Sequence, residues 1–140
     1  MHDRHVKVII DTNLWISFLI GLKASPAVRR ILTDGTVSIV MTDILQQEIM
    51  AVVASRPKFA RYFAPEACER LLAFLRARSE DYPLGDIPAR CRAPKDDYLL
   101  ELARVADADI LVTGDKDLTG LHQFGHCQIL TLAAFKRIYL

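Results

Sequence analysis

The chain has 140 residues, of which 51% are hydrophobic and 25% charged, and its formal net charge is +1 at pH 7. This length suits a single domain, residues 1–140, with an ordinary globular composition. The longest apolar runs, around Val8–Ile10 and Ile110–Val112, are too short to cross a bilayer. The N-terminus has no apolar signal core. We therefore expect a cytoplasmic protein without a membrane partner.

Cys68, Cys91 and Cys127 are odd in number and widely spaced. That pattern argues against a disulfide framework and against a structural zinc site. We expect three reduced thiols.

The near-neutral charge does not by itself predict a nucleic-acid binder, because such proteins usually have a strongly basic footprint. The basic residues are nevertheless clustered. The members are Arg56, Lys58, Arg61, Arg70, Arg76 and Arg78, followed by Arg90, Arg92 and Lys95. Taken alone these clusters indicate a solvated helix face, and they gain meaning only if another feature points to nucleic acid.

The expected elements alternate along the chain. The strands are Val6–Ile10, Val37–Met41, Asp109–Val112 and Cys127–Leu130, as short β-branched or apolar runs predict. The helices start at Ser25, at Thr42 or Asp43 (ending near Ser55), at Pro65, at Asp96 or Asp97, and at Thr131 (ending at Tyr139). Tyr82–Pro94, with three prolines and a glycine, predicts an irregular connection with at most one short strand.

Alternating strands and helices predict an α/β fold with a mainly parallel central sheet covered on both faces. In such folds the ligand crevice lies beyond the carboxyl ends of the strands, at the topological switch point. The residues that directly follow each strand are therefore the first candidates for a site.

Carboxylates occupy these positions. Asp11 directly follows the first strand, and Asp115 comes three residues after Val112. Asp96 and Asp97 open the helix that precedes the strand at Asp109–Val112, so they belong at the same end of the sheet. All three segments bring acidic side chains to one edge.

Glu48 is unusual for a different reason. On a helical wheel it lies between Ile44 and Val52, inside the edge of the apolar stripe. A carboxylate that faces a core is costly unless it is paired, protonated or bound to a cation. Its place in the second turn of the helix lets it reach the same edge.

Each acid also has a purely structural interpretation. Asp11 and Asp115 could be turn residues, Asp96 or Asp97 a helix cap, and Glu48 the partner of an arginine. These interpretations weaken together, because like charges that converge on one edge repel and need a counterion. Carboxylate oxygens without histidine or thiolate neighbours suit Mg²⁺ or Mn²⁺.

The whole chain resembles the PIN-domain family, and within it the VapC-like ribonucleases that act as toxins of toxin–antitoxin pairs. Four blocks carry the resemblance: Ile9–Asn13, Thr42–Ile49, Pro94–Asp97 and Leu111–Leu118. They imply a three-layer α/β/α sandwich, an endoribonuclease activity dependent on Mg²⁺ or Mn²⁺, a small antitoxin partner and a homodimer.

The resemblance also assigns residues. The acidic quartet would be Asp11, Glu48, Asp96 and Asp115, with Asp97 assisting at the metal or replacing Asp96. Apolar residues at +3, +4 and +7 favour Asp96. Supporting residues in the pocket would be Asn13, Thr113 and Asp117. Related sequences often have an acid where this chain has Ala93, which puts a local loop contact in doubt rather than the quartet.

In a ribonuclease the basic clusters would follow the phosphate backbone. The candidates are Arg56, Lys58, Arg61, Arg90, Arg92 and Lys95. Tyr98 could stack on a base, although a tyrosine in the core or on the surface is the more ordinary interpretation. His122 and His126 lie in a glycine-flanked stretch and are expected to be structural or exposed.

Two other functions compete with this one. A phosphatase of the haloacid dehalogenase type also places Asp after its first strand, but it needs a second Asp two residues later, where this chain has Asn13. A catalytically inactive PIN-like module that binds RNA or a protein partner is the stronger alternative. Stabilisation by metal without cleavage would favour that module.

Overall fold

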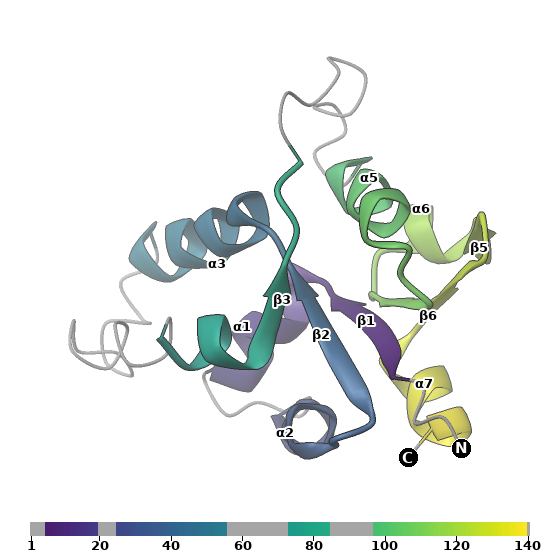
Figure 1. The fold of residues 1–140 in the computed structure, drawn as a ribbon, viewed down its shortest axis with the longest axis horizontal. Coiled ribbons are helices and arrows are strands. Elements are labelled where there is room, and N and C mark those ends of the chain that lie inside the picture. Colours follow the sequence, from purple (N-terminus) through teal and green to yellow (C-terminus); the bar gives the residue numbers. More distant parts are fainter. Residues whose placement is uncertain (1–4, 20–24, 56–72, 85–96, 140) are drawn as a thin grey trace.

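A six-stranded sheet forms the centre of the protein (Figure 1). The computed structural model describes residues 5–19, 25–55, 73–84 and 97–139. The strands lie in the order β3-β2-β1-β4-β6-β5, and all neighbours are parallel except the antiparallel pair β5 and β6. Their bounds are β1 Val6–Ile10, β2 Val37–Met41, β3 Ser79–Asp81, β4 Ile110–Val112, β5 Gln123–Phe124 and β6 Cys127–Leu130.

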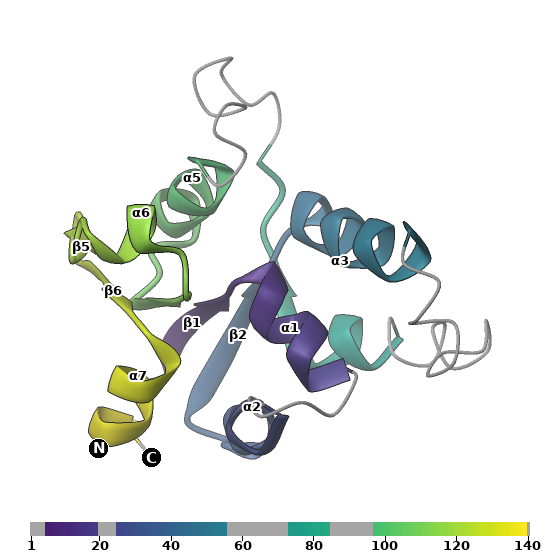
Figure 2. The same ribbon diagram turned by 180° about the vertical axis from the view of Figure 1, so that it is seen from behind.

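Helices cover this sheet on two sides. Their bounds are α1 Thr12–Leu19, α2 Ser25–Thr33, α3 Asp43–Ser55, α5 Asp97–Ala106, α6 Lys116–Thr119 and α7 Leu132–Tyr139, and residues 73–78 are also helical. Figures 1 and 2 show α1, α2 and α3 on one side of β1 and β2, with α5, α6 and α7 on the other. The predicted three-layer α/β/α sandwich is thus confirmed. Within the described ranges, no helix has the length and apolar character needed to span a membrane.

The central strands form where the sequence is most β-branched. Val8, Ile9 and Ile10 are completely buried, and all five residues of β2 are buried. Such side chains pack well on a pleated surface that is covered on both faces. The strands predicted at Val6–Ile10, Val37–Met41 and Cys127–Leu130 are confirmed at their bounds.

The chain reverses direction across the sheet between β1 and β4. It proceeds from β1 outward to β2 and β3, then returns to place β4 on the free side of β1. Ile10 is paired with Val112, so the residues that follow the two strands emerge side by side. The backbone N–H of Asp11 donates to the carbonyl of Val112 at 3.0 Å. This is the topological switch point at which such folds bind ligands.

Four short elements differ from the sequence prediction. α1, β3, α6 and β5 were not expected, and the short strand considered within Tyr82–Pro94 is not found in the described residues 82–84. β3 is only three residues long, with the polar sequence Ser-Glu-Asp, so it lacks the apolar pattern that would predict a strand. Its polarity suits the edge of a sheet, where charged residues discourage pairing with other chains. Residues 85–96 lie outside the described ranges.

The helix expected from Pro65 is described only in its last part. Residues 56–72 lie outside the described ranges, and residues 73–78 are helical, with Leu75 buried in the core. The thiol of Cys127 is free and buried, and burial raises its pKa to about 12. Cys68 and Cys91 fall outside the described residues, so the expectation of reduced thiols is met only at Cys127.

Candidate active site

Asp11 lies at the switch point, between the end of β1 and the start of α1. Its backbone carbonyl accepts hydrogen bonds from the N–H groups of Leu14 at 3.1 Å and Trp15 at 3.2 Å, which closes the first turn of α1. The side chain is only 4% exposed. A buried carboxylate needs compensating donors or a cation, because burial penalises its charged form.

Thr113, directly after β4, supplies one such donor. Its side chain is completely buried, and its hydroxyl donates to Oδ2 of Asp11 at 2.5 Å. The same hydroxyl accepts a hydrogen bond from the backbone N–H of Asp115 at 3.1 Å. One threonine therefore joins the end of β1 to the turn that carries the next acid.

Asp115 is the N-cap of α6. It is partly buried, and its Oδ1 accepts from the backbone N–H of Asp117 at 2.9 Å. The structural interpretation made from the sequence was a turn residue, whereas the structure gives Asp115 the role of a helix cap. A capping carboxylate needs only one of its oxygens for the helix N–H. Asp117 contributes its backbone N–H, and its side chain is exposed, as is that of Asn13 in the first turn of α1.

Glu48 approaches the same place from α3. Leu45, Ile49 and Val53 form the buried stripe of this helix, and Glu48 is half-buried at its edge. Its Oε1 accepts hydrogen bonds from two hydroxyls, those of Thr12 and, at 2.8 Å, Tyr98. Among the described residues its partners are thus hydroxyls, and the arginine considered from sequence is not one of them.

The acids influence one another electrostatically. The pKa of the Asp11 carboxyl is raised, mainly by burial and further by the negative charges of Glu48 and Asp115. Hydrogen bonds from Thr113 and from the backbone of Thr12 oppose that rise. Burial and the charge of Glu48 raise the pKa of Tyr98, which keeps its phenol protonated as a donor. Glu48 and Asp115 therefore both lie near enough to Asp11 to act on its charge.

Several predicted site residues fall outside the described ranges. They are Asp96, the side chain of Asp97, and the basic residues Arg56, Lys58, Arg61, Arg90, Arg92 and Lys95. The backbone of α5 begins at Asp97, and the bond from Tyr98 to Glu48 places that helix start beside α3. The described start of α5 thus lies next to Glu48.

Comparison with known proteins agrees with this geometry. The family model of the PIN domain matches residues 7–117, which is most of the chain and includes every acid of the site. The chain belongs to the PIN-domain family. No curated protein matches it.

The fold of this PIN domain is also found among solved structures. One chain in the crystal structure of VapBC2 from Rickettsia felis, bound to a DNA fragment from their promoter, matches with a TM-score of 0.56 and 14% identity. The match covers 89% of this chain and 97% of that chain. At this identity the similarity establishes the shared fold alone.

The acids of this PIN domain suit a hard divalent cation. Within the described ranges, no ion pair involves Asp11 or Glu48, although Asp11 is almost fully buried. In the same ranges, no three His, Cys, Asp or Glu side chains stand close enough to hold a metal ion by themselves. A complete ligand set would therefore draw on Asp96 or Asp97, together with Asp11, Asp115 and the second oxygen of Glu48.

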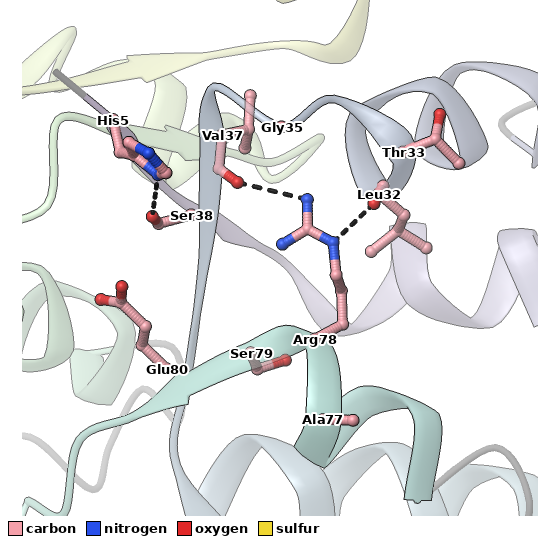
Figure 3. Close-up of a pocket in the computed structure, with 10 residues that line it drawn as sticks. All are labelled: His5, Leu32, Thr33, Gly35, Val37, Ser38, Ala77, Arg78, Ser79 and Glu80. Carbon is pink, nitrogen blue, oxygen red and sulfur yellow. Dashed lines mark hydrogen bonds between the residues drawn. The ribbon is translucent and has the colours of Figure 1, made fainter. Parts of the chain in front are cut away.

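Two candidates from the sequence have other roles. Tyr98 is 3% exposed, so its ring is buried and the suggestion that it stacks on a base is wrong. Arg78, part of the central basic cluster, donates to the carbonyls of Leu32 at 2.6 Å, Asp34 at 3.1 Å and Val37 at 3.2 Å. This guanidinium lines a hollow of about 340 Å³ near the amino ends of the strands. Figure 3 shows it among the residues that line the hollow. Arg78 thus secures the end of α2 instead of facing RNA.

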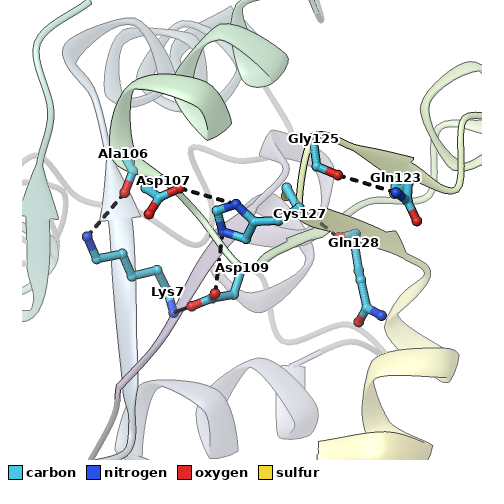
Figure 4. A network of polar contacts seen from close by, with 9 residues as sticks. Lys7, Ala106, Asp107, Asp109, Gln123, Gly125, Cys127 and Gln128 are labelled. Atoms are coloured by element: carbon cyan, nitrogen blue, oxygen red, sulfur yellow. Dashed lines mark hydrogen bonds and ion pairs between the residues drawn. The ribbon is translucent and has the colours of Figure 1, made fainter.

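His126 also lies away from the acids. Its ring nitrogens approach Asp107 at 3.2 Å and Asp109 at 3.6 Å, and the backbone N–H of Lys7 donates to Asp109 at 2.9 Å (Figure 4). Asp109 directly precedes β4, so this network lies at the opposite end of the sheet from Asp11. His122 is exposed, with a positive φ of 63°. Both histidines are structural or exposed, as predicted.

A pH dependence follows from the environment of Asp11. Its pKa is raised in the folded state above the ordinary value of 3.8, so the folded state holds this proton more tightly than the unfolded chain. The resulting stabilisation is complete below the unfolded pKa and is lost as the pH rises through the folded pKa. Asp34, whose pKa is lowered, has the opposite effect.

The contribution of Asp11 is therefore isolated by comparison with Asp11→Asn, with EDTA present. We expect the stability of the wild type relative to that variant to fall as the pH rises from the ordinary value of 3.8 through the raised folded-state pKa. Urea denaturation at several pH values measures it. A stability difference that stays constant across this range would show that Asp11 is not perturbed.

Proposed function

We propose that this PIN domain is an endoribonuclease that depends on Mg²⁺ or Mn²⁺. The observation that carries the proposal is the buried carboxylate of Asp11 at the switch point, with Glu48 and Asp115 close enough to raise its pKa. Selection for stability alone would not favour three carboxylates that repel one another in one region. The divalent cation would offset that repulsion.

Each residue of the site would have a distinct role in cation binding or proton transfer. Asp11 and Asp115 would bind the cation directly, and Asp96 (or Asp97 in its place) would complete the set. Glu48 would hold a second cation or accept the proton of the attacking water. Thr113 orients Asp11 through its hydroxyl. When bound, the cation supplies positive charge for the phosphodiester and makes water more acidic.

RNA is the proposed substrate. The basic side chains from Arg56 to Arg61 and from Arg90 to Lys95 would bind its phosphates, which predicts weak sequence preference and a strong dependence on salt. The family and the acidic site support this choice. A DNA oligonucleotide of the same sequence is the appropriate control, because the acids alone do not distinguish ribose from deoxyribose.

We further propose that the protein is cytoplasmic, forms a homodimer and is the toxin of a toxin–antitoxin pair. The VapC-like fold supports this proposal, since the matching chain was crystallised as part of a VapBC2 assembly. A small gene next to this one, whose product co-purifies with the chain and blocks cleavage, would support the pairing. Light scattering of the purified chain tests the dimer.

The test of the proposed activity is cleavage of a mixed RNA panel by the purified protein with Mg²⁺, Mn²⁺ or EDTA. Cleavage that needs the cation and spares matched DNA is expected. Cleavage of equal rate in EDTA would refute the cation-dependent mechanism. Stabilisation by the cation without cleavage of any RNA would favour the inactive binding module.

Cation binding should also stabilise the fold. A ligand that binds only the folded state adds about 2.7 kcal/mol at a concentration 100 times its dissociation constant. We expect Mn²⁺ to raise the thermal midpoint of the wild type, and EDTA to reverse the rise. The control is a Ca²⁺-free buffer in which NaCl replaces Mn²⁺ at the same ionic strength, because NaCl screens charges without binding a specific site. A midpoint that responds equally to NaCl and Mn²⁺ would argue against a specific site.

A further inference from the structure

Tyr98 contributes a buried hydroxyl where α5 begins. Its side chain is 3% exposed, and its hydroxyl donates to Oε1 of Glu48 at 2.8 Å. The hydroxyl of Thr12 donates to the same oxygen. In the described part of the chain, Oε2 of Glu48 has no hydrogen-bond partner. Two donors from different helices therefore hold one oxygen and leave the other available.

We propose that Tyr98 is a positioning residue, whose hydroxyl fixes the Glu48 carboxylate so that its second oxygen is available to the divalent cation. This inference rests on the proposed function, because it gives Glu48 a part in cation-dependent cleavage. Tyr98 also follows directly on Asp96 and Asp97 in the chain. The same hydrogen bond therefore connects the start of α5 with α3.

The chemistry of the two donors supports this role. A glutamate side chain has several rotatable bonds, and ordering it in the right geometry costs entropy that packing and hydrogen bonds must supply. An arginine in this place would neutralise Glu48 and compete with a metal ion. Neutral hydroxyls hold the carboxylate and leave its negative charge in place. The two hydroxyls thus orient Glu48 as a ligand without removing its affinity for a cation.

The test compares Tyr98→Phe with a matched control, Tyr82→Phe. Tyr82 makes the same kind of bond, from its hydroxyl to Oε1 of Glu80 at 2.9 Å, but next to the edge strand β3. We expect Tyr98→Phe to weaken Mn²⁺ binding about tenfold in calorimetry and to lower kcat by a similar factor, as the loss of a hydrogen bond to a charged group predicts. KM for RNA should not change. Tyr82→Phe should match the wild type in all three.

Repeating Tyr98→Phe in a Glu48→Gln background distinguishes a positioning role of Tyr98 from a purely structural one. If Tyr98 acts through Glu48, Tyr98→Phe should change Mn²⁺ affinity there by less than about twofold. Thr12→Val removes the other donor and should also weaken Mn²⁺ binding. Wild-type Mn²⁺ affinity in Tyr98→Phe, or an equal loss in both backgrounds, would overturn the proposal. A wild type that binds Mn²⁺ but cuts no RNA would refute the nuclease and leave this calorimetric comparison valid.

Discussion

Replacing Asp11 with asparagine is expected to lower the rate of RNA cleavage by about three orders of magnitude or more, as loss of a central member of a catalytic group usually does. Asp11 is the most buried of the described acids, and it lies between the ends of β1 and β4. An asparagine keeps the size of the side chain and can still accept from Thr113. It cannot supply the negative charge that holds the cation.

The same substitution should leave the fold intact. In EDTA it removes a buried charge that Glu48 and Asp115 repel, so the thermal midpoint should equal or exceed that of the wild type. Asp34→Asn is the matched control, because Asp34 lies in the turn after α2, where it accepts from Thr36. That control should cleave RNA normally. Asp11→Asn protein that is folded and fully active would refute the assignment of the site.

The second large effect is expected from Thr113→Val. Valine has nearly the same shape but cannot donate to Asp11 or accept from the backbone N–H of Asp115. Both groups would lose a partner in a buried place, at about 1–3 kcal/mol each. We expect a loss of about 2–4 kcal/mol in unfolding free energy. Cleavage should fall at least about tenfold, because the Asp11 carboxylate is no longer held.

Thr113→Ser is the control for this change, since serine keeps the hydroxyl and removes only a methyl group. Urea denaturation and cleavage of the same RNA measure both variants side by side. The serine variant should retain most of the activity and stability. If the valine and serine variants differ by less than about 0.5 kcal/mol and cleave equally well, the hydroxyl has no such role.

The sheet and much of the site could be predicted because their signals are local. β1 and β2 are β-branched runs buried on both faces, and Asp11 follows the first of them directly. Glu48 could be recognised because an acid within an apolar helical stripe needs a partner. The rule that sites form beyond the strand ends then placed these acids near each other.

The missed elements depend on contacts that the local sequence does not contain. α1 has no acidic residue in its first turn and is rich in aromatic and β-branched side chains such as Trp15 and Ile16. Those residues are buried, so the helix is stabilised by packing against α2 and α3 more than by propensity. α6 has only four residues and begins at its Asp115 cap.

The partners of Glu48 could not be predicted either. Thr12 is 36 residues away in sequence and Tyr98 is 50 residues away. A tyrosine at the start of an apolar helix has the pattern of an ordinary core residue, and only the fold brings its hydroxyl to Glu48. The threonine in Asp11-Thr12-Asn13 offered a weak signal, because a hydroxyl next to a candidate ligand is a common hydrogen-bond partner.

The central claim is that the acids around Asp11 bind a divalent cation and that RNA cleavage depends on this binding. The most direct measurement is a Mn²⁺ titration of the wild type and Asp11→Asn, with calorimetry and RNA cleavage recorded at the same concentrations. We predict that the cleavage rate of the wild type rises in parallel with Mn²⁺ occupancy, and that Asp11→Asn shows neither binding nor cleavage in this range. Cleavage that is independent of occupancy, or equal in the two proteins, would contradict the claim.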